Sequence, residues 1–200
     1  MARNRRARPQ AESLRLFVAV DMPEEVARAL EDSVRPWRER LESGRWVPRE
    51  NWHVTLKFLG RTWPRLLPLV EAACREVAGG VAPFEVALSG LGVFPGPGRA
   101  RVLWAGLDDP DGRLMGLAAG LDGSLVRDFP PEKRAFTPHL TVARFNPPIP
   151  MRDHAEELAA MAIEASPFVV DRLVLYRSHL SPRGARYEGL EDFPFGGADR

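Results

Sequence analysis

Cysteine, lysine and long apolar runs are scarce or missing in this 200-residue chain. The single cysteine, Cys74, excludes a disulfide within the chain and any metal cluster held by several thiolates. No apolar run approaches the roughly 20 residues that a membrane-spanning helix needs. We therefore predict a cytoplasmic protein without a membrane segment, built around one core of ordinary size.

The charges are nearly balanced, with 28 lysines and arginines against 27 acidic residues, so net charge gives no argument for a nucleic-acid partner. Lys57 and Lys133 are the only lysines, so nearly all positive charge is guanidinium, which can bind phosphate bidentately. A coding bias towards arginine would give the same composition. Residues 1–13 carry four arginines and no apolar stretch, and we predict a disordered basic lead-in there, followed by one catalytic domain over residues 14–200.

Hydrophobic periodicity predicts alternating strands and helices along the chain. Strands are expected at 14–20, 53–59, 84–91, 101–107, 139–143 and 168–176, with a last one around Tyr187. Helices are expected at 24–41, 63–77, 109–125 and 152–163. The prolines between Pro147 and Pro150 are predicted to stop the strand that begins at His139. This order, with two similar halves, predicts an α+β body with an internal pseudo-repeat.

One short pattern occurs twice, once in each half. The two copies read Trp52-His53-Val54-Thr55-Leu56 and Pro138-His139-Leu140-Thr141-Val142. In a strand, side chains alternate, so the histidine and threonine of each copy project together while their apolar neighbours enter the core. A single His-x-Thr is usually structural. Two copies in a pseudo-repeated chain predict that both pairs face one shared site.

Two histidines and two hydroxyls suit metal-free phosphodiester cleavage. Imidazole titrates near pH 6.5, so at neutral pH one ring can hold a proton while the other lacks one, as a general acid and a general base require. The threonine hydroxyls can donate hydrogen bonds to phosphoryl oxygens as charge develops there. Neither motif has an acidic neighbour at ligand spacing, so we predict no metal and no cofactor.

The motifs and their flanks resemble the two-histidine phosphoesterase superfamily, most closely its RNA 2′,3′-cyclic phosphodiesterases, also called 2′-5′ RNA ligases. The resemblance runs from about Leu14 to Leu190. It rests on Leu16-Phe17-Val18-Ala19-Val20-Asp21, Trp46-Val47-Pro48, His53-Val-Thr-Leu-Lys-Phe-Leu-Gly60, Leu91-Gly-Val-Phe-Pro95, Val102-Leu-Trp-Ala105, Phe136-Thr-Pro-His-Leu-Thr-Val-Ala-Arg144 and Leu175-Tyr176.

That resemblance implies a bilobal fold of two pseudo-symmetric antiparallel sheets with outer helices and a central cleft. It implies opening of a terminal 2′,3′-cyclic phosphate on RNA to a 2′-phosphate, with His53 as proton donor and His139 as proton acceptor. Thr55 and Thr141 would bind the phosphate. The expected partners are RNA 3′ ends with a cyclic phosphate, tRNA fragments among them, and the expected state is a monomer.

Arg144 follows the second motif where the family also has arginine, and the resemblance makes it a further phosphate contact. Strict alternation points it away from His139, so this role requires a local bulge. Lys57, by the same alternation, shares the face of His53 and either reaches phosphate or ends in solvent.

Trp46, Trp52 and Phe136 flank the motifs and either pack in the core or stack a base. The role of His179 stays open.

Two other functions fit the same motifs. One is a phosphodiesterase of the same superfamily acting on 2′-5′ oligonucleotides or small cyclic phosphates. The other is an RNA-end binding module without turnover, although binding alone would not need both imidazoles. Turnover of a nucleoside 2′,3′-cyclic monophosphate discriminates enzyme from binding module.

Overall fold

The computed structural model describes residues 12–182 and 184–197, so most of the predicted lead-in lies outside the described residues. The described strands are β1 (Leu14–Asp21), β2 (Arg45–Trp46), β3 (His53–Thr62), β4 (Phe84–Phe94), β5 (Ala100–Asp108), β6 (His139–Ile149), β7 (Phe168–Val170), β8 (Arg172–Ser181) and β9 (Gly184–Pro194). The described α-helices are α1 (Glu24–Arg40), α2 (Leu67–Gly79), α3 (Arg113–Leu125) and α4 (Ala155–Ala159), with short 3₁₀ turns at Arg49–Asn51, Pro64–Leu66 and Arg152–His154.

The strands form one curled antiparallel sheet in the order β7-β4-β5-β6-β3-β1-β8-β9, with β2 added beside β6. Two four-stranded halves meet where β3 adjoins β6, and the register there holds only one residue pair, Val54 with Leu140. We call β3, β1, β8 and β9 with α2 and α3 the β3 lobe, and β6, β5, β4 and β7 with α1 and α4 the β6 lobe. The fold is α+β, and the two lobes are the pseudo-symmetric units that the sequence predicts.

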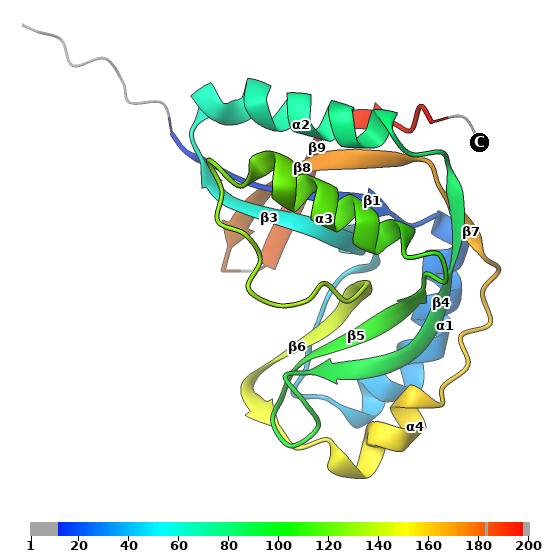
Figure 1. The fold of residues 1–200 in the computed structure, drawn as a ribbon. Coiled ribbons are helices and arrows are strands. Elements are labelled where there is room, and N and C mark those ends of the chain that lie inside the picture. Colours follow the sequence, from blue (N-terminus) through cyan, green and yellow to red (C-terminus); the bar gives the residue numbers. More distant parts are fainter. Residues whose placement is uncertain (1–11, 183, 198–200) are drawn as a thin grey trace, which may run out of the picture.

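The chain order shows the repeat. Residues 14–94 run β1, α1, β3, α2, β4, with the short β2 before β3, and residues 100–181 run β5, α3, β6, α4, β8, with the short β7 before β8. In Figure 1, α2 and α3 lie over the β3 lobe, whereas α1 and α4 lie behind and below the β6 lobe. The helix after the first strand of each repeat thus covers the other lobe. We call the face of each half-sheet that is turned away from these helices the open face.

Alternating side chains explain how each strand holds its helices. In β1, Leu16, Val18 and Val20 are buried in the main core, and in β3, Val54 and Leu56 join them. Helix α1 presents a buried stripe at spacings of three and four residues, namely Val26, Leu30, Val34 and Trp37. Among the described residues, no helix is both long and apolar enough to cross a membrane.

Three predicted elements differ from the structure in their bounds. Strand β6 continues through Pro147 and Pro148 to Ile149, because its register with β5 is interrupted between Arg144 and Ile149 and no ladder hydrogen bond is required of the proline nitrogens there. The helix predicted over 152–163 shrinks to a 3₁₀ turn and the five residues of α4, in which Leu158 alone is buried. The strand predicted over 168–176 is divided between β7 and β8.

Candidate functional site

The two His-x-Thr motifs lie side by side at the junction of the lobes. Because β3 and β6 are antiparallel and paired at Val54 and Leu140, the next residues face each other crosswise, His53 opposite Thr141 and Thr55 opposite His139. The two histidines are then diagonal neighbours, for which about 7–8 Å is usual in a sheet. Val54 and Leu140 are fully buried, and the four motif side chains are half-buried on the open face.

Each histidine is held by the backbone two residues before it. Nδ1 of His53 lies 2.9 Å from the carbonyl oxygen of Asn51, and Nδ1 of His139 lies 2.7 Å from that of Thr137. A carbonyl oxygen only accepts, so both Nδ1 atoms carry the hydrogen, and the neutral rings keep a free electron pair on Nε2. Nε2 of His53 lies 3.0 Å from the hydroxyl of Thr55. Each Nε2 is therefore the atom that can take up or release a proton at the site.

Electrostatics disfavour charge on both rings. Burial lowers the pKa of His53 to about 4; the Asn51 hydrogen bond opposes this shift, and the charges of Arg144 and His139 add to it. Burial and Arg144 lower the pKa of His139 in the same direction, against the hydrogen bond to Thr137. At neutral pH the free protein thus holds two neutral imidazoles. An anionic phosphate between them would raise both pKa values.

Arg144 lies on the open face because β6 contains a bulge. Leu103 pairs with Ala143 and Trp104 with Thr141, so Val142 has no partner on β5 and both Val142 and Ala143 are buried. The alternation restarts one residue later, which brings the exposed Arg144 to the side of His139 and Thr141. After burial, its positive charge is a further cause that lowers the pKa of both histidines.

The same bulge in β3 turns Lys57 the other way. Val18 pairs with Lys57 and Ala19 with Thr55, which leaves Leu56 without a partner. Lys57 is 1% exposed, forms an ion pair with Asp122 of α3 and donates to the Pro130 carbonyl at 2.8 Å. Both predictions for Lys57, that it reaches substrate phosphate or that it ends in solvent, are therefore wrong. It fastens the segment that leads to His139.

The aromatic residues that flank the motifs in sequence do not line the open face. Trp52 is 6% exposed in the core, and Phe136 packs against the core. Trp46 pairs with the buried Ala143 and carries the Arg38 guanidinium 5.4 Å from its ring, on the side of α1. For these residues, core packing rather than base stacking is the role that the structure supports.

Other aromatic rings surround the histidines instead. Phe17 stacks on His53 with centroids 4.7 Å apart, Tyr176 stacks on Phe17 at 5.2 Å, and Tyr187 meets His53 edge-on at 5.1 Å. Around His139, the contacts of Phe94 at 5.0 Å and Trp104 at 6.3 Å are edge-on. Sequence reasoning missed these five. The available signal was that Phe17, Phe94, Trp104 and Tyr176 stand in segments that carry the family resemblance.

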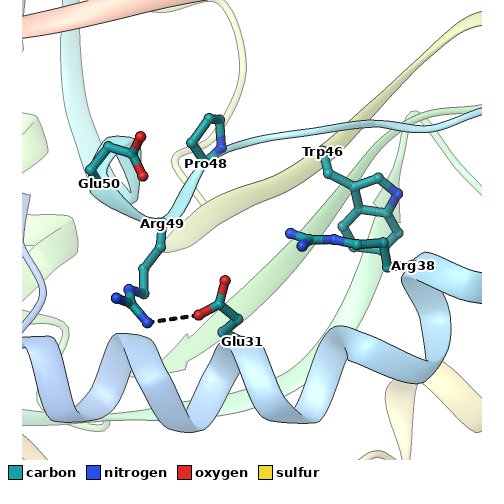
Figure 2. A pocket seen from close by; sticks show the side chains of 6 residues that line it. All are labelled: Glu31, Arg38, Trp46, Pro48, Arg49 and Glu50. Carbon is teal, nitrogen blue, oxygen red and sulfur yellow. Dashed lines mark hydrogen bonds and ion pairs between the residues drawn. The ribbon is translucent and has the colours of Figure 1, made fainter.

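His179 lies apart from the motif histidines in the β8–β9 hairpin, where Nε2 contacts the Glu188 carboxylate at 2.7 Å. A surface pocket between α1 and the segment 46–50 also lies outside the site. Figure 2 shows its lining, with the ion pair of Arg49 and Glu31 at 2.7 Å, and Trp46 places it on the helix side of the β6 lobe.

Comparisons with known proteins match most of the chain. A family model described as the 2′-5′ RNA ligase superfamily matches residues 23–182. A protein of Methanothermobacter thermautotrophicus named RNA 2′,3′-cyclic phosphodiesterase is 36% identical over 187 residues, covering 90% of this chain and 98% of its own. One of the same name from Thermotoga maritima is 32% identical over 186 residues, covering 92% of this chain and 97% of its own.

Solved structures show the same fold. A crystal structure of a Thermus thermophilus protein matches with a TM-score of 0.77 and 34% identity, over 93% of this chain and all of that one. The structure of E. coli LigT complexed with 3′-AMP matches with a TM-score of 0.66 and 27% identity, again over 93% of this chain and all of that one.

Proposed function

Because the chain belongs to the 2′-5′ RNA ligase superfamily, we propose that it is a hydrolase that opens the terminal 2′,3′-cyclic phosphate of RNA and leaves a 2′-phosphate. Relatives over 30% identical carry the name RNA 2′,3′-cyclic phosphodiesterase. The observation that carries the proposal is the crosswise pairing of the two motifs, with both Nε2 atoms on one face. Residues 14–200 act as a single catalytic domain.

The reaction needs one proton donor and one acceptor on opposite sides of a phosphorus atom. His139 Nε2 takes a proton from water as the water oxygen bonds to phosphorus, and His53 Nε2 gives its proton to the 3′ oxygen as the bond from phosphorus to that oxygen breaks. Both Nδ1–H groups stay on their carbonyls throughout, which fixes the rings. His53 takes up its second proton from solvent when the anionic substrate binds, because burial, together with the charges of Arg144 and His139, holds its pKa at about 4 in the free protein.

The phosphate is bound by groups that match its charge. The Thr55 and Thr141 hydroxyls donate hydrogen bonds to non-bridging oxygens, and Arg144 adds a guanidinium on the same face. A bound anion offsets the burial and the Arg144 charge that depress the histidine pKa values. Substrate binding therefore supplies the condition under which His53 can act as an acid.

The test is turnover of an oligoribonucleotide that ends in a 2′,3′-cyclic phosphate, with the product identified by phosphorus NMR. We expect a 2′-phosphate. A 3′-phosphate would make the 2′ oxygen the leaving group and contradict the proposal. Binding of the RNA end without turnover would establish the binding module, and turnover of 2′-5′-linked oligonucleotides in preference to cyclic ends would establish the other phosphodiesterase.

A further inference from the structure

The open face of the β3 lobe continues beyond His53 and Thr55 as an ordered series of side chains. Along β1 and β3 the register pairs Ala19 with Thr55, then Phe17 with Phe58, then Arg15 with Arg61. Bulges at Leu56 and Leu59 keep the second and third pairs on the open face, while Leu16 and Val18 between them are buried in the core. Successive pairs stand about 6.6–6.8 Å apart along a strand, so the arginines lie about 13 Å from Ala19.

The middle pair presents an aromatic surface. Phe17 is buried beneath its neighbours, but Phe58 is 60% exposed, with its ring centroid 6.2 Å from that of Phe17. An exposed phenyl ring supported from behind by a second ring suits a stacked nucleobase, because any base offers a π face. Trp63, just after β3, is a further exposed aromatic side chain at this end of the strand and is 45% exposed.

The third pair is unfavourable for the fold alone. Arg15 and Arg61 are exposed and directly opposite each other on neighbouring strands, and like charges in that position destabilise a sheet. Across residues 12–182 and 184–197, neither guanidinium has a carboxylate partner in an ion pair. An anion placed between the two would remove the repulsion. Paired guanidinium groups are well suited to a phosphodiester.

We propose that Phe58, Arg15 and Arg61, which we call the strip, bind the RNA strand on the 5′ side of the cyclic end. Phe58 stacks a base, and Arg15 and Arg61 bind a backbone phosphate. The inference rests on the proposed function, which places the cyclic phosphate at the histidines. It adds which residues bind the strand beyond its cyclic end, because the arginine pair lies too far along the sheet to bind the terminal phosphate.

The experiment compares kcat/KM for a short oligoribonucleotide with a 2′,3′-cyclic phosphate and for a nucleoside 2′,3′-cyclic monophosphate. The ratio is kcat/KM for the oligoribonucleotide divided by kcat/KM for the mononucleotide. In Arg15→Ala/Arg61→Ala this ratio should fall about tenfold or more, the fold-change of one lost charge-assisted contact. The slope of the logarithm of the oligonucleotide binding constant against the logarithm of salt concentration (the salt slope) should shrink by about 0.7, because one phosphate contact is lost. The matched control is Arg28→Ala/Arg35→Ala, which removes the same charge from the exposed surface of α1 and should keep the ratio.

Arg61→Glu separates the proposal from damage to the fold. It creates an opposite-charge pair with Arg15, so the melting temperature should hold or rise while the ratio falls. Phe58→Ala should weaken oligonucleotide binding about 5- to 140-fold, and Phe58→Tyr should restore it. An unchanged ratio and an unchanged salt slope in both arginine variants would overturn the proposal that the strip binds RNA.

Binding of an oligoribonucleotide with a 2′-phosphate end, followed by fluorescence anisotropy, keeps the two proposals distinct. If the wild-type chain hydrolyses neither substrate, the proposed function fails. The strip still stands when the arginine variants bind this product strand more weakly than the control, and it falls when they bind it equally well.

Discussion

Strands β3 and β6 carry the same motif and hold it in the same way, yet they differ two residues past each threonine. Both histidines donate from Nδ1 to the carbonyl two residues earlier, and both strands bulge at the residue after the threonine. After the bulge, β3 has the buried Lys57 and the exposed Phe58, whereas β6 has the buried Ala143 and the exposed Arg144.

This difference makes a symmetric scaffold electrically asymmetric. The β6 lobe brings the guanidinium of Arg144 to the open face directly after its bulge, and the β3 lobe brings the phenyl ring of Phe58 to the corresponding place. The surroundings of the rings differ too: His53 is stacked face to face with Phe17, and His139 meets only ring edges. Two histidines held alike can thus take different roles, because their neighbours differ.

The sharpest way to break the comparison is to remove each histidine in turn. If His53 is the acid, His53→Ala leaves a slow enzyme without an alkaline limb in its pH–rate profile, and His139→Ala loses the acidic limb instead. Each change should cost about 10²–10⁴-fold in kcat. The measurement is kcat and kcat/KM from about pH 5 to about pH 9, a range that spans the ordinary histidine pKa.

His179→Ala serves as the control, since His179 pairs with Glu188 away from the motifs and its loss should leave the profile intact. The wild-type limbs belong to the coupled pair, so only the single variants assign them. Burial holds the pKa of His53 near 4 in the free protein, and a bound phosphate raises it. The alkaline limb should therefore lie at higher pH in kcat than in kcat/KM. Exchanged limbs in the variants would exchange the roles.

The threonines test whether the hydroxyls act alike. Thr55→Ala and Thr141→Ala should each lower kcat more than they raise KM, because their hydrogen bonds strengthen as charge builds on the phosphoryl oxygens. Loss of one preorganised donor costs about 2.7–4 kcal/mol in well-studied sites, and a rotatable hydroxyl gives less. The serine variants keep the hydroxyl and should recover most of the rate. Wild-type kinetics in both alanine variants would make the threonines structural.

Arg144→Ala removes the asymmetry itself. The guanidinium lowers the pKa of both histidines, so its loss should raise both values and move the whole pH profile towards alkaline pH. Loss of a hydrogen bond from a charged group costs about 1.5–3 kcal/mol, which predicts a fall of about 10- to 150-fold in kcat/KM. Arg144→Lys, which keeps the charge, should hold the profile in place. A profile that stays at its original pH in Arg144→Ala would place the arginine outside the site.

Much of this arrangement follows from local pattern. Periodicities of two and of three to four residues predict the strands, the apolar helix stripes and the paired His-x-Thr motifs, and these periodicities can be recognised from neighbouring residues alone. Local pattern does not predict the faces on which Lys57 and Arg144 lie. Each face depends on a bulge, and a bulge arises from the register between two strands. The same holds for Phe17 and Tyr176, which reach His53 from strands distant in sequence.

The smallest effect concerns treatment with a chelator, which we expect to leave the rate of hydrolysis unchanged. A divalent metal bound by the two motifs could use only one nitrogen of each histidine, since both Nδ1 atoms donate to carbonyl oxygens. Within the described ranges, no three residues of the types His, Cys, Asp and Glu gather as ligands, and Arg144 places positive charge where a cation would sit. Hydrolysis of the cyclic-phosphate RNA end should therefore proceed at the untreated rate after exhaustive EDTA treatment and dialysis.

The control adds back magnesium, manganese and zinc one at a time. Activity that vanishes with EDTA and returns with one of them would replace the two-imidazole mechanism by a metal-assisted one, and the comparison of the motifs would then describe two sets of ligands.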